Sequence, residues 1–148
     1  MASNTRPQFK HPIPRKSSDV PADGEILPVS ADTVLSVADI DDAIVEIAWH
    51  GISIVVRKMI ELDDIPGFVA SVLDVCWLGE YYAKEMVDFV FRCTVIAMYS
   101  NIKLPEDSRV NYKLVYGTDL YKTISNCANS DQINALRCAI EMYINNTQ

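Results

Sequence analysis

The sequence has no apolar run long enough to cross a membrane, because a spanning helix needs about 20 apolar residues. The longest candidate, Met86–Tyr99, is interrupted by Asp88 and Arg92. The N-terminal residues are polar, basic and rich in proline, which is not the pattern of an apolar signal-peptide core. We therefore expect a protein that is made and kept in a cytoplasm and has no membrane partner.

Cysteine and histidine are few and widely spaced. The only histidines are His11 and His50, and no two cysteines have the C-x-x-C spacing that is typical of zinc sites. We therefore expect no metal site and no cofactor. We interpret the cysteines as small buried hydrophobic residues in a reducing compartment. They are Cys76, Cys93, Cys127 and Cys138.

Glycine is also scarce, and its spacing disfavours a nucleotide site. None of the five glycines recurs at a G-x-G or P-loop spacing. His50 is the one histidine outside the N-terminal region, and no nucleophile or orienting carboxylate accompanies it in the sequence. The carboxylate pairs Asp41-Asp42 and Asp63-Asp64 are interpreted as helix-capping residues. We expect no catalytic residues, unless a distant cysteine or carboxylate converges on His50.

The net charge of −7 is unevenly distributed along the chain. Most acidic residues lie after residue 30, and an acidic body repels phosphate groups. We therefore do not expect nucleic acid as a partner. A basic protein surface would be attracted instead.

Residues 1–40 are expected to form an extended, basic, proline-rich arm and connector, and residues 41–148 a single globular domain. Five of the seven prolines lie in the first 30 residues, where proline removes donors and restricts the preceding residue. Such an arm has too little apolar surface to offset its lost entropy, so we expect it to bind a neighbouring subunit. The arm residues expected to bind partners are Arg6, Phe9, Lys10, Arg15 and Lys16.

Alternating apolar residues predict a β-hairpin over residues 45–57, with His50-Gly51 as its turn and glycine supplying a positive φ. Two strands alone are marginally stable, so the hairpin must pack on helices, and a free edge can pair with another chain. The face predicted to be apolar holds Val45, Ile47, Trp49, Ile52, Ile54 and Val56.

The rest of the chain predicts about four helices, so the expected fold class is α+β, a hairpin packed on a small helical bundle. Asp63 is predicted to cap the first helix, and the second is predicted to span about residues 81–101. Thr118 and Asp119 offer caps for a third helix, and Ser130 and Asp131 for the last. Residues 110–116 fit either a strand or a helix.

Two of these helices show apolar stripes at helical spacing. The stripe of the first is Ile65, Phe68, Val69, Val72, Leu73 and Cys76. The second is apolar most of the way round, which predicts a central helix. One face of it is predicted to hold Tyr82, Met86, Phe89, Val90, Cys93 and Ala97.

The corner between these two helices, residues 77–82, is rich in aromatic residues and is a candidate protein contact, since interface hot spots favour Trp and Tyr. An ordinary packed corner is the alternative. Together with the hairpin, this gives the body residues expected to bind partners: Trp49, His50, Trp77, Tyr81 and Tyr82.

Three runs carry a resemblance to a known family: WHGISIVVRKMIELDDIPGFV, VDFVFRCTVIAMYSNIKLP and YKLVYGTDL. The chain from about Val45 to Ile144 resembles a family of small structural or assembly proteins of tailed bacteriophages, especially phages of gut bacteria. The resemblance implies a non-enzymatic virion component at the head, head–tail joint or tail, made in the host cytoplasm. Its implied partners are other phage structural proteins and further copies of itself in a homo-oligomer.

Three alternatives remain open at this point. A phage anti-defence inhibitor would block a host protein through complementary surface charge. A tail-assembly chaperone would act during assembly and be absent from the finished particle. A small enzyme would need the unseen convergence of other residues on His50.

Overall fold

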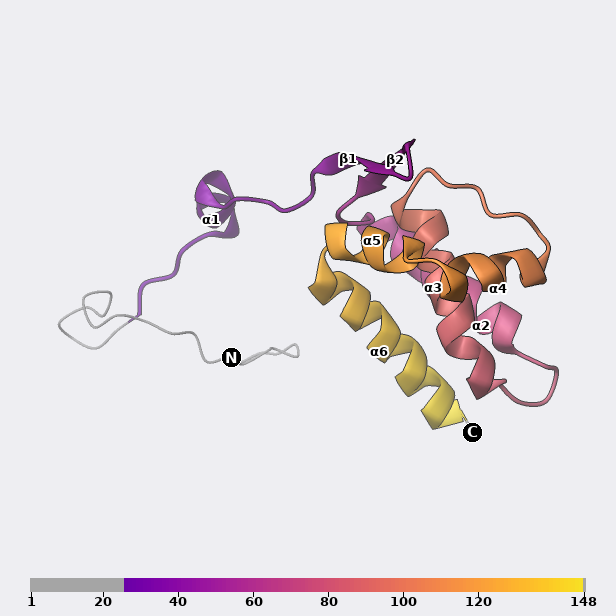
Figure 1. Ribbon diagram of the computed structural model, residues 1–148. Coiled ribbons are helices and arrows are strands. Elements are labelled where there is room, and N and C mark those ends of the chain that lie inside the picture. Colours follow the sequence, from indigo (N-terminus) through magenta and orange to yellow (C-terminus); the bar gives the residue numbers. More distant parts are fainter. Residues whose placement is uncertain (1–25, 148) are drawn as a thin grey trace. The chain divides into compact units, whose positions relative to one another are not determined.

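Over the residues that the structure describes, a two-stranded β-hairpin and six α-helices form the fold, which confirms the expected α+β class (Figure 1). The computed structural model describes residues 26–147. The chain divides between Asp39 and Ile40 into two units. The described part of the first unit contains one short helix, α1 (Ala31–Val37), which starts where the Ser30 hydroxyl accepts a hydrogen bond from the Thr33 amide at 3.2 Å.

The hairpin forms where the alternating pattern predicts it. Strand β1 (Ile44–Trp49) pairs antiparallel with β2 (Ile52–Arg57), and Trp49 faces Ile52 across a two-residue turn. His50 and Gly51 both have positive φ angles, 49° and 79°. A turn with two positive φ angles suits the right-handed twist of paired strands, and histidine tolerates this region better than bulkier or β-branched residues do.

The hairpin rests on the helices through one face and one edge. Ile54 and Val56 are buried, and the predicted inward residues of β1 pack against the core. The outer edge of β2 is occupied by Asn101. The Val55 amide donates to the Asn101 side-chain oxygen at 3.0 Å, and the Val55 carbonyl accepts a hydrogen bond from the Asn101 amide at 3.1 Å. The β2 edge of the hairpin is therefore closed by the chain that follows α3.

Five helices follow the hairpin in the described part of the second unit, one more than the sequence predicts, because residues 110–116 form a helix and not a strand. Two short 3-10 turns, η2 (Leu62–Asp64) and η3 (Lys84–Met86), precede the first two helices. The helices are α2 (Ile65–Cys76), α3 (Val87–Tyr99), α4 (Ser108–Gly117), α5 (Leu120–Cys127) and α6 (Ser130–Thr147).

Two predicted helix starts are wrong. Asp63 makes no capping bond; it lies in η2, and α2 begins only at Ile65. The second helix begins at Val87 and not at residue 81, because the Ala83 amide donates to the Cys76 carbonyl at 2.8 Å and holds the chain in an extended bridge.

The caps of the last two helices also differ in detail from the prediction. The Thr118 hydroxyl accepts from the Leu120 amide at 3.1 Å, as expected, whereas the Asp119 carboxylate is used elsewhere. At α6 the cap is Asn129, whose side-chain oxygen accepts from the Gln132 amide at 2.9 Å. Ser130 and Asp131 lie inside the first turn of α6, where the Asp131 charge favours the positive end of the helix.

The core is centred on α3, which contacts α2, α4 and α5. The α2 stripe is confirmed, since Phe68, Val72 and Cys76 are fully buried. On α3 the prediction is partly wrong, because the most deeply buried side chains lie on the opposite face from Met86 and Ala97, which are exposed. The buried residues of α3 are Val87, Val90, Phe91, Thr94, Val95, Ile96 and Tyr99.

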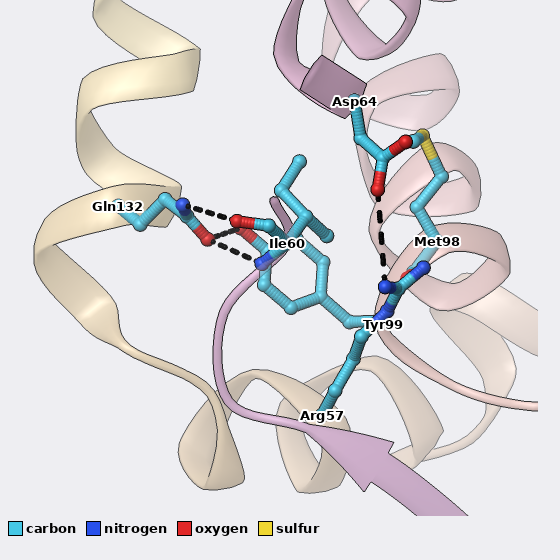
Figure 2. Close-up of polar contacts among 6 residues, drawn as sticks. All are labelled: Arg57, Ile60, Asp64, Met98, Tyr99 and Gln132. Atoms are coloured by element: carbon cyan, nitrogen blue, oxygen red, sulfur yellow. Dashed lines mark hydrogen bonds and ion pairs between the residues drawn. The ribbon is translucent and has the colours of Figure 1, made fainter. Parts of the chain in front are cut away.

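A single polar side chain, Gln132, joins three parts of this core (Figure 2). Its side-chain oxygen accepts from the Ile60 amide at 2.9 Å and from the Tyr99 hydroxyl at 2.6 Å. Its amide group donates to the Ile60 carbonyl at 3.1 Å. Ile60 and Tyr99 are almost fully buried, so these groups have no water to replace a lost partner.

A second polar tie lies beside it (Figure 2). The Arg57 side chain at the end of β2 donates to the Met98 carbonyl at 3.0 Å and lies 3.8 Å from the Asp64 carboxylate. The Asp64 charge predicted to cap α2 is therefore directed to the end of the hairpin.

Among residues 26–147, no helix combines the length and apolar character needed to span a membrane.

Replacing Gln132 by alanine should lower the free energy of unfolding by about 1–3 kcal/mol, since it leaves buried groups of Ile60 and Tyr99 unpaired. Equilibrium denaturation in urea measures this change. Asn134→Ala, at an exposed position of the same helix, is the matched control. In a Tyr99→Phe background the cost of Gln132→Ala should shrink, and an equal cost in both backgrounds would contradict the assignment.

Candidate protein-binding groove

The structure gives Trp49 and His50 different roles. Trp49 is half-buried on the inner face of the hairpin, and its indole N–H donates to the Asp119 carboxylate at 2.8 Å. This bond ties the tip of β1 to the start of α5. His50 is exposed at the turn, and its ring stands edge-on to Trp49 with centroids 4.6 Å apart. Trp49 therefore serves the fold, and only His50 is left on the surface.

The aromatic corner is an exposed, closed loop. Trp77 and Tyr82 pair through an antiparallel bridge, with ring centroids 4.9 Å apart, and Gly79 supplies the positive φ of 95° that closes the loop between them. Trp77 and Tyr81 are exposed, while Tyr82 is half-buried and its ring meets that of Tyr143 edge-on. The corner is packed at Tyr82 and exposed at Trp77 and Tyr81, and its role as a protein contact stays a prediction.

The predicted body residues do not form one site. The hairpin meets the C-terminal end of α3, where Val56 bridges to Ser100, whereas the corner precedes the N-terminal end of the same helix. An α-helix of this length separates its ends by about 20 Å. The predicted arm residues, Arg6, Phe9, Lys10, Arg15 and Lys16, lie outside the described residues.

A different surface gathers aromatic side chains into a hollow between α3 and α4. Phe89 of α3 lies under Tyr112 and Tyr116 of α4, with ring centroids 5.6 Å and 6.2 Å away, and the two tyrosine rings are 5.0 Å apart. Met86 completes the apolar wall. The hollow has a volume of about 580 Å³, within the range typical of ligand and peptide pockets.

A second hollow of about 320 Å³ adjoins the first, and Phe89 and Ser108 line both. Its floor is the other end of the α3 face that carries Phe89, namely Cys93 and Ala97, and its far wall includes Val75 of α2. We call the two hollows together the aromatic groove. The α3 face that the sequence predicts as core thus forms the floor of a surface groove.

The rim of the aromatic groove is basic on a body that is otherwise acidic. Arg109 and Lys113 project from α4 at the larger hollow, and Glu85 is the acidic residue that lines it. Arg109 lies 3.5 Å from Asp107, with its side chain almost entirely exposed. These charges can meet an acidic partner at the edge of an apolar contact.

An ionic cluster behind the groove fixes its tyrosine wall. The Asp88 carboxylate accepts a 2.5 Å hydrogen bond from the Tyr116 hydroxyl and lies 3.0 Å from Arg92 and 3.1 Å from Arg137. Arg92 also stacks on the rings of Tyr116 and Tyr121, 5.3 Å and 4.6 Å from their centroids. Residues of α3, α4, α5 and α6 therefore meet at this cluster.

The cluster shifts the pKa values of its members. Burial by itself would raise the pKa of Asp88, but the hydrogen bond from Tyr116 and the charges of Arg92 and Arg137 together lower it. Burial, followed by the hydrogen bond to Asp88, raises the pKa of Tyr116 to about 12. Tyr116 thus remains a neutral donor to an ionised carboxylate at neutral pH.

The cysteines do not add a reactive group to the groove. Burial raises the pKa of the Cys93 thiol to about 11, so it stays protonated at neutral pH and is a poor nucleophile. All four cysteines are free thiols, and Cys138 is exposed on the outer face of α6, so the prediction that it is buried is wrong. Within residues 26–147, no three His, Cys, Asp or Glu side chains are grouped so that they could hold a metal ion.

Sequence reasoning missed the groove because its parts are far apart in the chain. Tyr112 and Tyr116 are four residues apart and share a face of α4, which is a visible signal once that segment is known to be helical. Phe89 is more than twenty residues away and gave no signal beyond its place on an apolar helix.

No family model, no curated protein and no solved structure matches the chain.

Replacing Asp88 by asparagine should make stability depend less on pH. The folded-state pKa of Asp88 lies below its ordinary value of 3.8, so its stabilisation is present above that pH and is lost as pH falls through the folded value. The difference in free energy of unfolding between wild type and Asp88→Asn should therefore be larger at pH 6 than at pH 3. Urea denaturation at several pH values measures it.

Asp74→Asn, which removes an exposed acid of α2, is the matched control. It should give a small difference at every pH, because Asp74 makes no ion pair with any of the described residues. A difference for Asp88→Asn that stays constant between pH 3 and pH 6 would contradict the role of the ionised carboxylate.

Proposed function

We propose that this chain is a non-enzymatic structural or assembly protein that works by binding other proteins, including copies of itself. The observation that carries the proposal is the aromatic groove, an open apolar surface with a basic rim on an acidic body. Aromatic side chains held rigidly at a hollow are the kind of residue that dominates protein contacts. The ionic cluster at Asp88 supports it, since it holds the tyrosine wall in place before any partner arrives.

The proposal extends to the place of action through the resemblance of the sequence to small proteins of tailed bacteriophages. In a virion, such a chain would act as an adaptor or decoration component that ties repeated subunits at the head, the head–tail joint or the tail. Repeated subunits in symmetric particles need contacts that recur between copies. The arm of residues 1–40 and the groove would supply two such contacts per chain.

The full chain should form an assembly of defined stoichiometry, which size-exclusion chromatography with light scattering measures directly. A single mass that is a small multiple of 16.6 kDa over a hundredfold range of concentration is the expected result. A chain that remains a monomer up to about 100 μM would contradict self-association, since structural subunits assemble well below that level.

The place in a particle needs a separate measurement. Quantitative mass spectrometry of density-purified particles, taken from a bacterial strain that produces this chain during phage growth, gives its copy number per particle. A fixed number of copies supports a virion component. Presence in the lysate but absence from particles would instead favour an assembly chaperone or an inhibitor.

A further inference from the structure

The described part of the first unit carries apolar side chains that it cannot bury by itself. Helix α1 has seven residues, and none of them is buried. Each large apolar side chain of residues 26–39 is more than half exposed: Ile26, Leu27, Val29, Val34, Leu35 and Val37. We call residues 26–39 the apolar segment.

Such exposure over a short stretch is unusual for a protein surface, and it is typical of a segment that docks on another surface. The segment is also shaped for docking before it binds. The Ser30 hydroxyl caps α1, and Asp32 lies in its first turn, where its charge is favourable. A preformed helix loses less entropy on binding than a disordered one.

The apolar segment and the aromatic groove are complementary in charge as well as in character. The segment contains Asp32 and Asp39 and has no lysine or arginine. The larger hollow presents Arg109 and Lys113 at its rim. An aliphatic, acidic helix and an aromatic hollow with a basic edge are therefore complementary surfaces.

The segment has two parts, and the groove has two hollows. Residues 26–29 have no regular secondary structure, and α1 follows them. A seven-residue helix is about 10 Å long, which matches the stretch of α4 between Arg109 and Tyr116. The larger hollow suits α1, and the adjoining hollow over Cys93 and Ala97 suits the aliphatic residues before it.

Only a short connector links the segment to the second unit of its own chain. The connector is held at the base of the hairpin, because Lys58 pairs with Asp41 at 2.9 Å and its amide donates to the Ala43 carbonyl at 3.0 Å. From Asp41 back to Val37 the chain spans at most about 14 Å. The groove floor at Phe89 lies about 16 Å along α3 from Ser100, which bridges to β2 at that same base.

In Figure 1 the start of β1 and helix α4 lie on opposite sides of the helical unit. A groove on another copy has no such constraint.

We propose that the apolar segment, residues 26–39, of one copy docks in the aromatic groove of a second copy. The contact is head-to-tail, since the segment and the groove are different surfaces. It closes in an exchanged dimer or a ring, or it continues as a filament if the rotation does not close. The inference rests on the proposed self-association and names the surfaces that produce it.

Two full-length variants test the joint. Leu35→Asp disables the segment, and Tyr112→Glu disables the groove, each at an exposed position where the fold tolerates a charge. Each alone should weaken association at least tenfold in sedimentation velocity. Met142→Asp, at an equally exposed apolar position of α6, is the matched control and should leave association unchanged. Far-UV circular dichroism confirms that each variant is folded, and Lys113→Glu replaces Tyr112→Glu if the latter unfolds.

Mixing the two variants is the decisive step. The segment variant keeps its groove and the groove variant keeps its segment, so a one-to-one mixture should form a complex of two chains that neither variant forms alone. A mixture that stays dissociated overturns the head-to-tail joint. Variants that keep the wild-type mass also overturn it, while the proposed function stands. A wild-type chain that is always a monomer removes both.

Discussion

The hydrogen bonds of Gln132 set the relative positions of three segments that are distant in the sequence. One side chain satisfies both backbone groups of Ile60 and the hydroxyl of Tyr99. Ile60 lies between the hairpin and α2, and Tyr99 ends α3. Because these groups are shielded from water, losing one bond costs more than it would at the surface. The start of α6 is therefore fixed against the hairpin connection and the central helix together.

The position of α6 then determines the back of the groove. Arg137 lies five residues after Gln132 in the same helix and reaches Asp88 of α3. The Asp88 carboxylate in turn accepts a hydrogen bond from the Tyr116 hydroxyl and so orients α4. A surface feature thus depends on a chain of polar contacts that begins in the core. Rigid support of this kind reduces the ordering cost of a later contact.

Both units carry a net negative charge, and the proposed contact between copies depends on a local exception to it. The acidic surface keeps separate chains soluble and repels non-specific approach. The basic rim at Arg109 and Lys113 is a local exception placed beside the apolar hollow. In the proposed contact, the acidic, aliphatic segment would be attracted to this rim. Electrostatics would select the surface, and apolar burial would supply most of the affinity.

The sequence by itself determined the hairpin with its turn, the apolar stripe of α2 and the central role of α3, since these follow from local periodicity and from the turn preference of glycine. It left residues 110–116 open, because a segment with apolar residues at both spacings fits a strand and a helix alike. Only the tertiary structure decided that Trp49 is a tie to Asp119 and that Phe89 lies half-buried at a surface groove beside Tyr112 and Tyr116. Those outcomes depend on which side of an all-round apolar helix its neighbours cover, and local pattern carries no information about neighbours that come from distant parts of the chain.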